Sequence, residues 1–363
     1  MFKELKAFTV RMIAGANVAT VVIMLIVGFS DYVQPAHHPY LSILGLVFPV
    51  CLFANLCFLL FWLLFKLRYA LIPFVGFVLC YVPVRKYVPF NMERTVPKGS
   101  IKVLSYNTWC FGQQTEDEDG NNPVIDYLEE QDADIICLQE ATHNEKEQQQ
   151  IDRILKPMYA YRDFTIHPNG GNALALFSKY PILSKEMIPY ISKGNMSMAY
   201  RLNIKGKEVL LINNHLETTG LSLEERKQFK KLVKGNLQRD TAEETSKLLA
   251  VKLAEATRKR APQADAVSRY LEQHQGMRVI LCGDFNDGPI SYAHRKIAEH
   301  LTDCYVESGC GLGISYHRGG FFVRIDNMMC SKDMIPYNCH VDDKISVSDH
   351  YPIVCYLKMK PKY

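Results

Sequence analysis

The first 90 residues of the chain contain very little charge. Of the 42 Lys and Arg residues in the 363-residue sequence only seven lie there, and of the 38 Asp and Glu residues only two. The surface of a soluble protein needs far more charge, so a wholly soluble protein is excluded as the leading interpretation. The remaining residues carry 35 basic and 36 acidic side chains, a composition typical of a globular domain.

This second part of the chain has no excess of positive charge, which argues against a domain that binds nucleic acid mainly through bulk charge. No cysteine pair has the spacing of zinc ligands or of a redox CxxC motif. Four cysteines could pair in an oxidising compartment, and the sequence leaves this open: Cys304, Cys310, Cys330 and Cys339. No repeat or low-complexity tract is present, so one large domain with a substantial core is expected.

Three uncharged, apolar runs fill the first part, at 12–30, 41–65 and 69–84. A helix needs ~20 apolar residues to cross a hydrocarbon core of ~30 Å. The first two runs are long enough, whereas the third is short and contains Pro73 and Pro83. Three successive runs argue against a signal peptide or a single buried helix. We therefore expect a bundle of about three transmembrane helices within 1–90, a linker at 91–100 and a catalytic domain at 101–360.

The basic residues of the short loops predict the orientation of this bundle. They precede the first run and separate the second from the third: Lys3, Lys6, Arg11, Lys66 and Arg68. The loop at 31–40 has no Lys or Arg, so the N-terminus is expected in the cytoplasm. Three spans then place the domain outside the cytoplasm, in a multi-pass protein of the inner or plasma membrane. Arg85 and Lys86 favour the opposite side, and a third run that only re-enters would leave the domain inside.

Short β-like runs recur in the second part, at 102–106, 134–138, 173–177, 208–213, 278–282, 325–330 and 352–357. Helical stretches at 123–130 and 223–273 lie between them, and Ser222 with Glu225 forms a capping box at the start of the second. This mixture predicts an α/β fold with at least one sizeable sheet. We expect loops at 113–122, 184–201 and 304–320. The basic start of 223–273 fits a solvated face or a surface for phosphate polymers or anionic lipid headgroups.

Polar residues with catalytic potential lie next to the ends of these β-like runs. They are Asn107, Glu140, Asn214, His215, Asp284, Asn286, Asp326, Asp349 and His350. Carboxylate and amide oxygens are hard ligands that suit Mg²⁺ or Mn²⁺, and the lack of cysteine among them argues against structural zinc. A divalent ion beside His and Asp fits phosphoryl chemistry.

Six short motifs extend this pattern along the chain. They are Tyr106-Asn107, Leu138-Gln139-Glu140, Asn214-His215-Leu216, Gly283-Asp284-Phe285-Asn286, Arg324-Ile325-Asp326 and Ser348-Asp349-His350-Tyr351-Pro352. Together and in this order they resemble the endonuclease/exonuclease/phosphatase superfamily, over about residues 102–357. The resemblance implies a DNase I-like, four-layer α/β sandwich of two packed sheets flanked by helices.

The resemblance also implies roles for individual residues. Glu140 would be the main metal ligand, with Asn107 beside it and Asp349 completing the site. Asp284 would orient or deprotonate the attacking water, and Asn286 would hold a phosphate oxygen.

The histidines would bind the phosphoryl group. His350 would contact the scissile phosphoryl with Asp326 behind it, and His215 would be a second phosphate-binding histidine. Asn172 and Arg201 are weaker candidates for substrate binding, because they cannot be aligned with the motifs.

The motifs leave the substrate open. A nuclease or nucleotide phosphodiesterase is the first expectation, with Trp109 and Phe111 available to stack on bases. A lipid-headgroup phosphodiesterase of the sphingomyelinase type and a phosphomonoesterase are the alternatives. An inactive membrane scaffold is disfavoured, because none of the motif positions is replaced. The expected partners are the lipid bilayer and a phosphodiester, and no protein partner is predicted.

Overall fold

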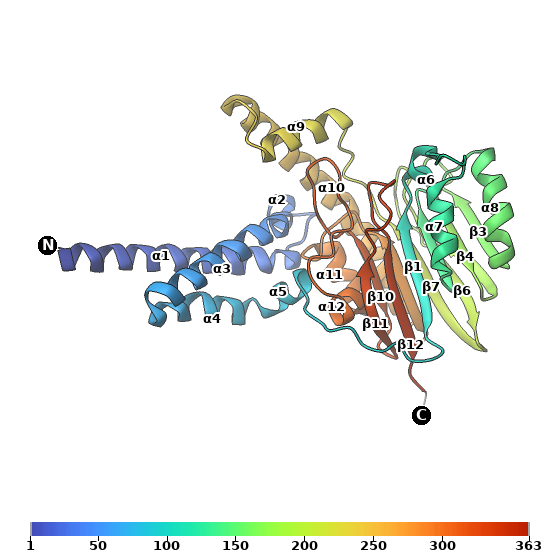
Figure 1. Ribbon diagram of the computed structural model, residues 1–363, viewed down its shortest axis with the longest axis horizontal. Helices are drawn as coiled ribbons and strands as arrows, with labels where there is room; N and C mark the ends of the chain where they lie inside the picture. The colour runs from blue at the N-terminus through green and yellow to red at the C-terminus, as the bar shows by residue number, and fades with distance from the viewer. Residues whose placement is uncertain (1, 362–363) are drawn as a thin grey trace.

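The computed structural model describes residues 2–361, which form a bundle of apolar helices attached to one side of a large α/β domain (Figure 1). The bundle contains α1 (Phe2–Gly28), α3 (Phe48–Phe65), α4 (Leu71–Leu79) and α5 (Tyr81–Tyr87), with the short α2 (Pro39–Ser42) between α1 and α3. Short 3₁₀ turns connect them: η1 (Ser30–Tyr32), η2 (Leu44–Val47) and η3 (Leu67–Ala70). Two of these helical segments are long and apolar enough to cross a membrane. The pair α4–α5 adds a third span only if its 71° bend belongs to one crossing.

Polar side chains hold α1 against α3 inside this apolar bundle. The Trp62 indole donates to Asn17 at 3.0 Å, and the Asn17 amide donates to Asn55 at 3.3 Å. All three side chains are buried, whereas Val50, Phe53 and other apolar side chains cover the outside. Polar side chains between the helices and apolar side chains on the outside are expected of helices that are surrounded by lipid.

Two six-stranded sheets form the α/β domain. The first has the order β11 (Met334–Val341), β12 (Ile353–Met359), β1 (Ile101–Asn107), β2 (Ile135–Gln139), β4 (Ala173–Ser178) and β3 (Tyr161–Ile166). The second has the order β5 (Ile182–Met187), β6 (Ser197–Ile204), β7 (Lys207–His215), β8 (Arg278–Asp284), β10 (Asp326–Cys330) and β9 (Thr302–Asp303).

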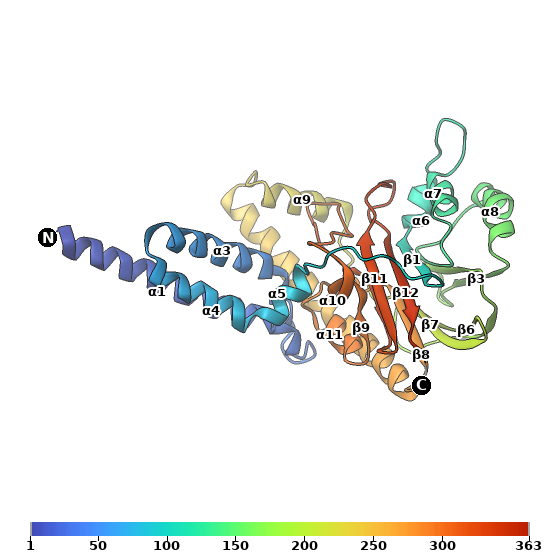
Figure 2. The same cartoon turned by 60° about the horizontal axis from the view of Figure 1, so that its bottom comes forward.

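The sheets pack face to face, and helices cover both outer faces (Figures 1 and 2). One apolar core, with Tyr200 and Leu176, fills the space between the sheets. A second core lies under α7 (Pro123–Gln131) and α8 (Glu145–Met158), and a third under α10 (Arg239–Gln273) and α11 (Tyr292–Ala298). The predicted four-layer α/β sandwich is therefore confirmed.

Some predicted elements differ from the structure. The segment expected as a loop at 184–201 contains most of β5 and β6, so that prediction is wrong. The single helix expected at 223–273 is two helices, α9 (Leu223–Val233) and α10, although the capping box of Ser222 and Glu225 is present. The cysteine pairing left open by the sequence is absent, since all eleven cysteines lie within the described residues and are free thiols.

The ends of the apolar helices are fixed to the α/β domain by specific contacts. The buried Asp31 carboxylate pairs with Lys86 at 2.8 Å, and the Asp31 carbonyl accepts from Arg295 at 2.9 Å. Gly45 lies directly on the backbone of Ile290, where an added Cβ would come within 2.0 Å of the carbonyl oxygen. The bundle and the domain are therefore in close contact along this boundary.

Candidate active site

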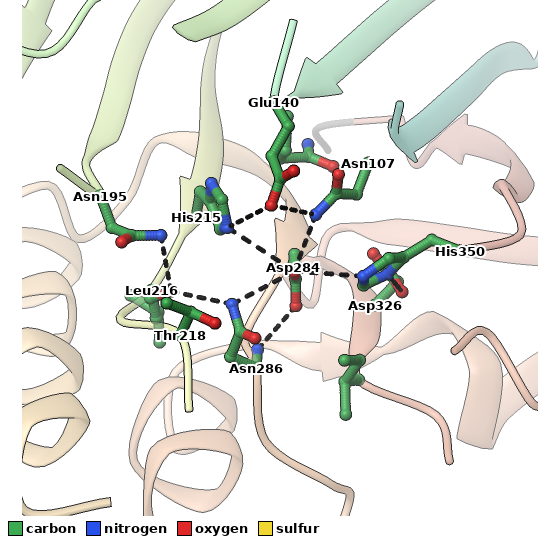
Figure 3. A network of polar contacts seen from close by, with 12 residues as sticks. Asn107, Glu140, Asn195, His215, Leu216, Thr218, Asp284, Asn286, Asp326 and His350 are labelled. Carbon is green, nitrogen blue, oxygen red and sulfur yellow. Dashed lines mark hydrogen bonds and ion pairs between the residues drawn. The ribbon is translucent and has the colours of Figure 1, made fainter. Parts of the chain in front are cut away.

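Strand ends bring the predicted polar residues to one edge of the two sheets (Figure 3). The strands β7 and β8 are parallel, so His215 lies opposite Asp284, and antiparallel pairing places Asp326 on the other side of Asp284. In the facing sheet Asn107 ends β1, and Glu140 follows β2, the parallel neighbour of β1. Residues from six motifs therefore meet because strand ends position them, and the most distant of these residues, Asn107 and His350, are 243 positions apart in the sequence.

Asp284 lies at the centre of this group and is almost completely buried. Its carboxylate accepts from the Asn107 amide at 3.0 Å and from the Asn286 amide and backbone at 3.2 and 2.7 Å. Asn286 adopts a positive φ of 52°, which folds its side chain back onto Asp284. Position 283, directly before Asp284, requires glycine, because a Cβ at this position would come within 1.9 Å of the Asn214 carbonyl oxygen.

His350 faces Asp284 from the other sheet. Its Nε2 lies 3.8 Å from the Asp284 Oδ2, and its Nδ1 lies 2.8 Å from Asp326, which is buried behind it. Ser348 accepts from the His350 backbone at 3.1 Å and donates to the Asn107 carbonyl at 2.8 Å. This turn therefore ties His350 to the end of β1.

Glu140 and Asp349 form the side of the group nearest the opening. Glu140 has a positive φ of 49°, and its Oε1 lies 3.4 Å from the Asn107 amide and 3.8 Å from the His215 Nε2. Asp349 accepts from Arg226 at 3.3 Å, and Arg226 in turn donates to the Tyr316 hydroxyl at 2.7 Å. The positive φ of Glu140 is uncommon for a non-glycine residue, and such residues are often found at functional sites.

Burial and charge perturb the titration of these groups. Burial raises the pKa of Asp284 to about 7, although the nearby His350 charge opposes this. Burial lowers the pKa of His350, but Asp326 and Asp284 more than compensate and bring it to about 10. Burial and the charge of His350 lower the pKa of His215 to about 3. At neutral pH His350 is therefore an imidazolium, and His215 is neutral.

The donor set fits a divalent cation. Four carboxylates, those of Glu140, Asp284, Asp326 and Asp349, lie in this group, and the cationic side chains of Arg226 and His350 contact three of them. Burial, and less strongly the proximity of Asp349, raise the pKa of Glu140, although the nearby charges of His350 and Arg226 oppose this. Ligand atoms of Asp284, Asp326 and His350 also lie within 4.8 Å of one another. However, the direct bond between His350 and Asp326 already uses one atom of each, so Glu140, Asn107 and Asp349 suit a hydrated cation better.

A pocket of about 970 Å³, including its solvent-open part, leads to this group. Its polar wall includes Glu140, Asp284, Asn286, Asp349 and His350, which all came from the sequence motifs. The pocket residues outside the motifs include Thr218, Arg226 and Tyr316. Thr218 follows His215 by only three positions, whereas nothing in the sequence connects Tyr316 with Arg226.

The weaker sequence candidates have different positions. Asn172 precedes Ala173, whose carbonyl accepts from the residue after Glu140 at 2.9 Å, so Asn172 lies beside the site without lining the pocket. The structure does not bring Arg201 to this group. Its guanidinium pairs with Glu208 at 3.0 Å on the exposed surface, four positions along β6 from Ser197 at the site edge.

The two aromatic residues expected to stack on bases, Trp109 and Phe111, lie in different surroundings. Trp109 lines the pocket, and Arg318 lies over its ring at 4.8 Å. Phe111 is completely buried under α7, so the expectation that it stacks on a base is wrong. Both belong to α6 (Trp109–Gln114), whose residues have positive φ values and which forms a left-handed turn.

Comparison with known protein families gives two matches. Residues 104–350 match the model of the Endonuclease/Exonuclease/phosphatase family, which is more than half of the chain. Residues 10–87 match a Domain of unknown function (DUF8431). The curated proteins contain no match to the chain.

Solved structures share the fold at low sequence identity. The catalytic domain of human Nocturnin, with a bound sulfate anion, aligns over 73% of this chain and 97% of its own at 15% identity and a TM-score of 0.52. An endonuclease/exonuclease/phosphatase from Beutenbergia cavernae DSM 12333 aligns over 72% of each chain at 14% identity and a TM-score of 0.50. A mannosyl-6-phosphatase from Bacteroides thetaiotaomicron VPI-5482 covers 72% of this chain and 100% of its own, at 16% identity and a TM-score of 0.48.

Proposed function

Because the chain belongs to the endonuclease/exonuclease/phosphatase family and is a hydrolase of phosphoester bonds, we propose that it is a membrane-anchored, Mg²⁺-dependent phosphodiesterase. The observation that carries this proposal is the position of Asp284. Its carboxylate is held by Asn107 and Asn286, and the His350 imidazolium lies 3.8 Å away at the end of an open pocket.

Glu140, Asn107 and Asp349 would hold the metal, and Mn²⁺ would be a possible substitute. Bound there, the cation would offset the excess of carboxylate charge and the charge on the phosphate oxygens. Side chains of the protein would accept the proton from water and bind the phosphoryl group.

Asp284 acts as the general base. A carboxylate with a pKa of about 7 is ionised often enough at neutral pH to accept a proton and basic enough to take it from water. Asn107 and Asn286 fix its orientation. The water oxygen bonds to phosphorus, the ester P–O bond breaks, and the leaving oxygen takes up a proton.

His350, His215 and Asn286 bind the phosphoryl group. His350 donates from Nε2 to a phosphoryl oxygen, while Asp326 accepts from Nδ1 and keeps the ring charged and oriented. His215 is neutral, and neither of its buried nitrogens hydrogen-bonds with another described residue. It is therefore available to the substrate.

The predicted layout has residues 1–90 as the membrane anchor, 91–100 as the linker and 101–360 as the catalytic domain. The turn between α3 and α4, which contains Lys66 and Arg68, lies at the end of these helices remote from the sheets (Figure 1). A cytoplasmic position of these residues would place the catalytic domain outside the cytoplasm, which supports the orientation expected from the sequence.

A nuclease or nucleotide phosphodiesterase remains a candidate for the specific activity. Trp109 favours it, since an indole at the pocket wall under Arg318 is a platform on which a base can stack. Hydrolysis of oligonucleotides that falls on Trp109→Ala would support this candidate.

Hydrolysis of bis-p-nitrophenyl phosphate by the full chain in detergent tests the proposed chemistry. Activity should require Mg²⁺, disappear with EDTA and return when Mg²⁺ is restored. Activity that persists in EDTA would contradict the metal dependence.

A further inference from the structure

The wall of the catalytic pocket has a second, apolar half. Ile43 and Leu46 line the same pocket as Asp284 and His350, together with Leu221, Leu253 and Val323. Ile43 and Leu46 belong to the candidate membrane span Pro39–Phe65. A segment apolar enough to lie in a bilayer therefore contributes directly to the pocket in which the phosphoester is cleaved.

The position of this segment is fixed by the fold. Gly45, between the two pocket residues, lies on the Ile290 carbonyl, and α2 packs against α10 of the catalytic domain. The ion pair of Asp31 with Lys86 and the bond from Arg295 hold the neighbouring loop. Ile43 and Leu46 are thus as much part of the pocket as the residues of the domain itself.

Apolar surface continues from the pocket to the outside of the helix bundle. Leu46 and Val47 are 39% and 45% exposed, and Val50 and Phe53, at helical spacing along α3, are 68% and 67% exposed. Residues spaced by three or four positions share one helix face. A long apolar chain could therefore lie along this face while remaining in contact with the pocket.

Positive charge lies on a helix that is on the same side of the sheets as the apolar bundle. The helix α9 and the start of α10 extend from the sheets along the same side as the apolar helices in both views (Figures 1 and 2). Exposed lysines lie on α9 and at its end: Lys227, Lys230, Lys231 and Lys234. Basic residues next to a bilayer attract anionic lipid headgroups.

We propose that the substrate is a phosphoester lipid of the membrane in which the chain is anchored, and this rests on the proposed function. The phosphate reaches Asp284 and His350, while the apolar chain lies against Ile43, Leu46 and Leu253. Water supplies oxygen to phosphorus and a proton to the released alcohol, so hydrolysis separates the lipid into its phosphate-bearing and alcohol parts. A nucleic acid has no apolar part for this half of the pocket, and the catalytic part of the chain has no excess of positive charge to hold a polyanion.

The test uses the full chain in phosphatidylcholine nanodiscs that carry sphingomyelin, phosphatidylglycerol or phosphatidic acid in turn. Mass spectrometry follows Mg²⁺-dependent loss of each lipid, and bis-p-nitrophenyl phosphate in the same preparation reports the chemistry. Leu46→Gln is compared with Leu41→Gln, which makes the same change at an exposed position of the same segment outside the pocket. Leu253→Gln probes an apolar pocket residue of α10 without changing the membrane segment.

We expect Leu46→Gln and Leu253→Gln to lower lipid turnover at least tenfold more than they lower turnover of the soluble ester, with Leu41→Gln unchanged in both assays. Lipid turnover unaffected in both pocket variants would overturn the inference. So would hydrolysis of the soluble ester with none of the four phospholipids cleaved, and in that case the proposed function would stand. If the wild type hydrolysed neither the lipids nor the soluble ester, the result would instead contradict the proposed function.

Discussion

His350 donates from Nδ1 to the buried carboxylate of Asp326 at 2.8 Å. Because Asp326 lies on the side of the ring away from the pocket, the bond fixes the direction in which Nε2 points. The same carboxylate helps to raise the pKa of His350 to about 10. Asp326 therefore determines both the orientation and the charge of the residue proposed to bind the phosphoryl group.

The substitution Asp326→Asn should move the alkaline limb of the kcat/KM profile to lower pH. A carboxylate stabilises the imidazolium, so its removal lowers the pKa of His350, and the ring loses its proton at a lower pH. The measurement is kcat/KM against pH at saturating Mg²⁺. An alkaline limb that stays in place, with only a lower maximum, would contradict the electrostatic role of Asp326.

Asp284→Ala and His350→Ala should each reduce the rate at least ~100-fold, as expected when a general base or a phosphoryl donor is removed. The matched control is Asp343→Ala, which removes an exposed carboxylate that does not line the pocket. Steady-state rates with bis-p-nitrophenyl phosphate measure the effect. Full activity in either site variant would refute the role assigned to that residue.

Glu140→Gln should raise the Mg²⁺ concentration needed for half-maximal activity by at least tenfold. The amide keeps the size of the side chain but loses the charge that a divalent cation requires. A Mg²⁺ titration of activity measures the change, and calorimetric titration of Mg²⁺ provides a second readout. An unchanged Mg²⁺ requirement would remove Glu140 from the metal site.

Gly45→Ala should destabilise the contact between the apolar helices and the catalytic domain, by about 1–3 kcal/mol, as overpacking usually does. Gly15→Ala is the matched control, because a Cβ at Gly15 meets no atom within 4 Å. Thermal unfolding of the full chain in detergent, with and without each substitution, gives the comparison. Equal midpoints for the two variants would show that the Gly45 contact contributes nothing measurable.

The sequence predicted the inner strands far better than the strands at the sheet edges. The seven predicted runs correspond to β1, β2, β4, β7, β8, β10 and β12. Four of the strands that were not predicted, β3, β5, β9 and β11, are at the edges of the sheets. Edge strands need not be continuously apolar because one side faces solvent, and five of the six residues of β5 are exposed.

The residues proposed to be catalytic were identifiable because they follow strands that are buried on both faces. Asp284 ends the completely buried β8, and Glu140 follows the completely buried β2. Tyr316 and Thr218 lie in loops, where no periodicity marks their position. The pairing of Arg226 with Asp349 joins residues 123 positions apart, and no local pattern predicts such a contact.

The contribution of Ile43 and Leu46 to the pocket likewise could not be predicted from the sequence. An apolar run predicts that a segment can cross a membrane, but it does not predict which part of the domain the end of the run contacts. Here Gly45 permits a backbone approach that any other residue would prevent. That contact depends on the whole fold and not on the run itself.

Hydrolysis of a phosphoester by Asp284 and His350 with a divalent metal is the proposal on which the other assignments depend. The most direct test is Mg²⁺-dependent turnover of bis-p-nitrophenyl phosphate by the full chain in detergent, beside the His350→Ala chain. Turnover by the wild type that requires Mg²⁺ and falls at least ~100-fold in His350→Ala is the predicted result. Equal turnover by the two proteins, or turnover that EDTA does not remove, would contradict the assignment of this site.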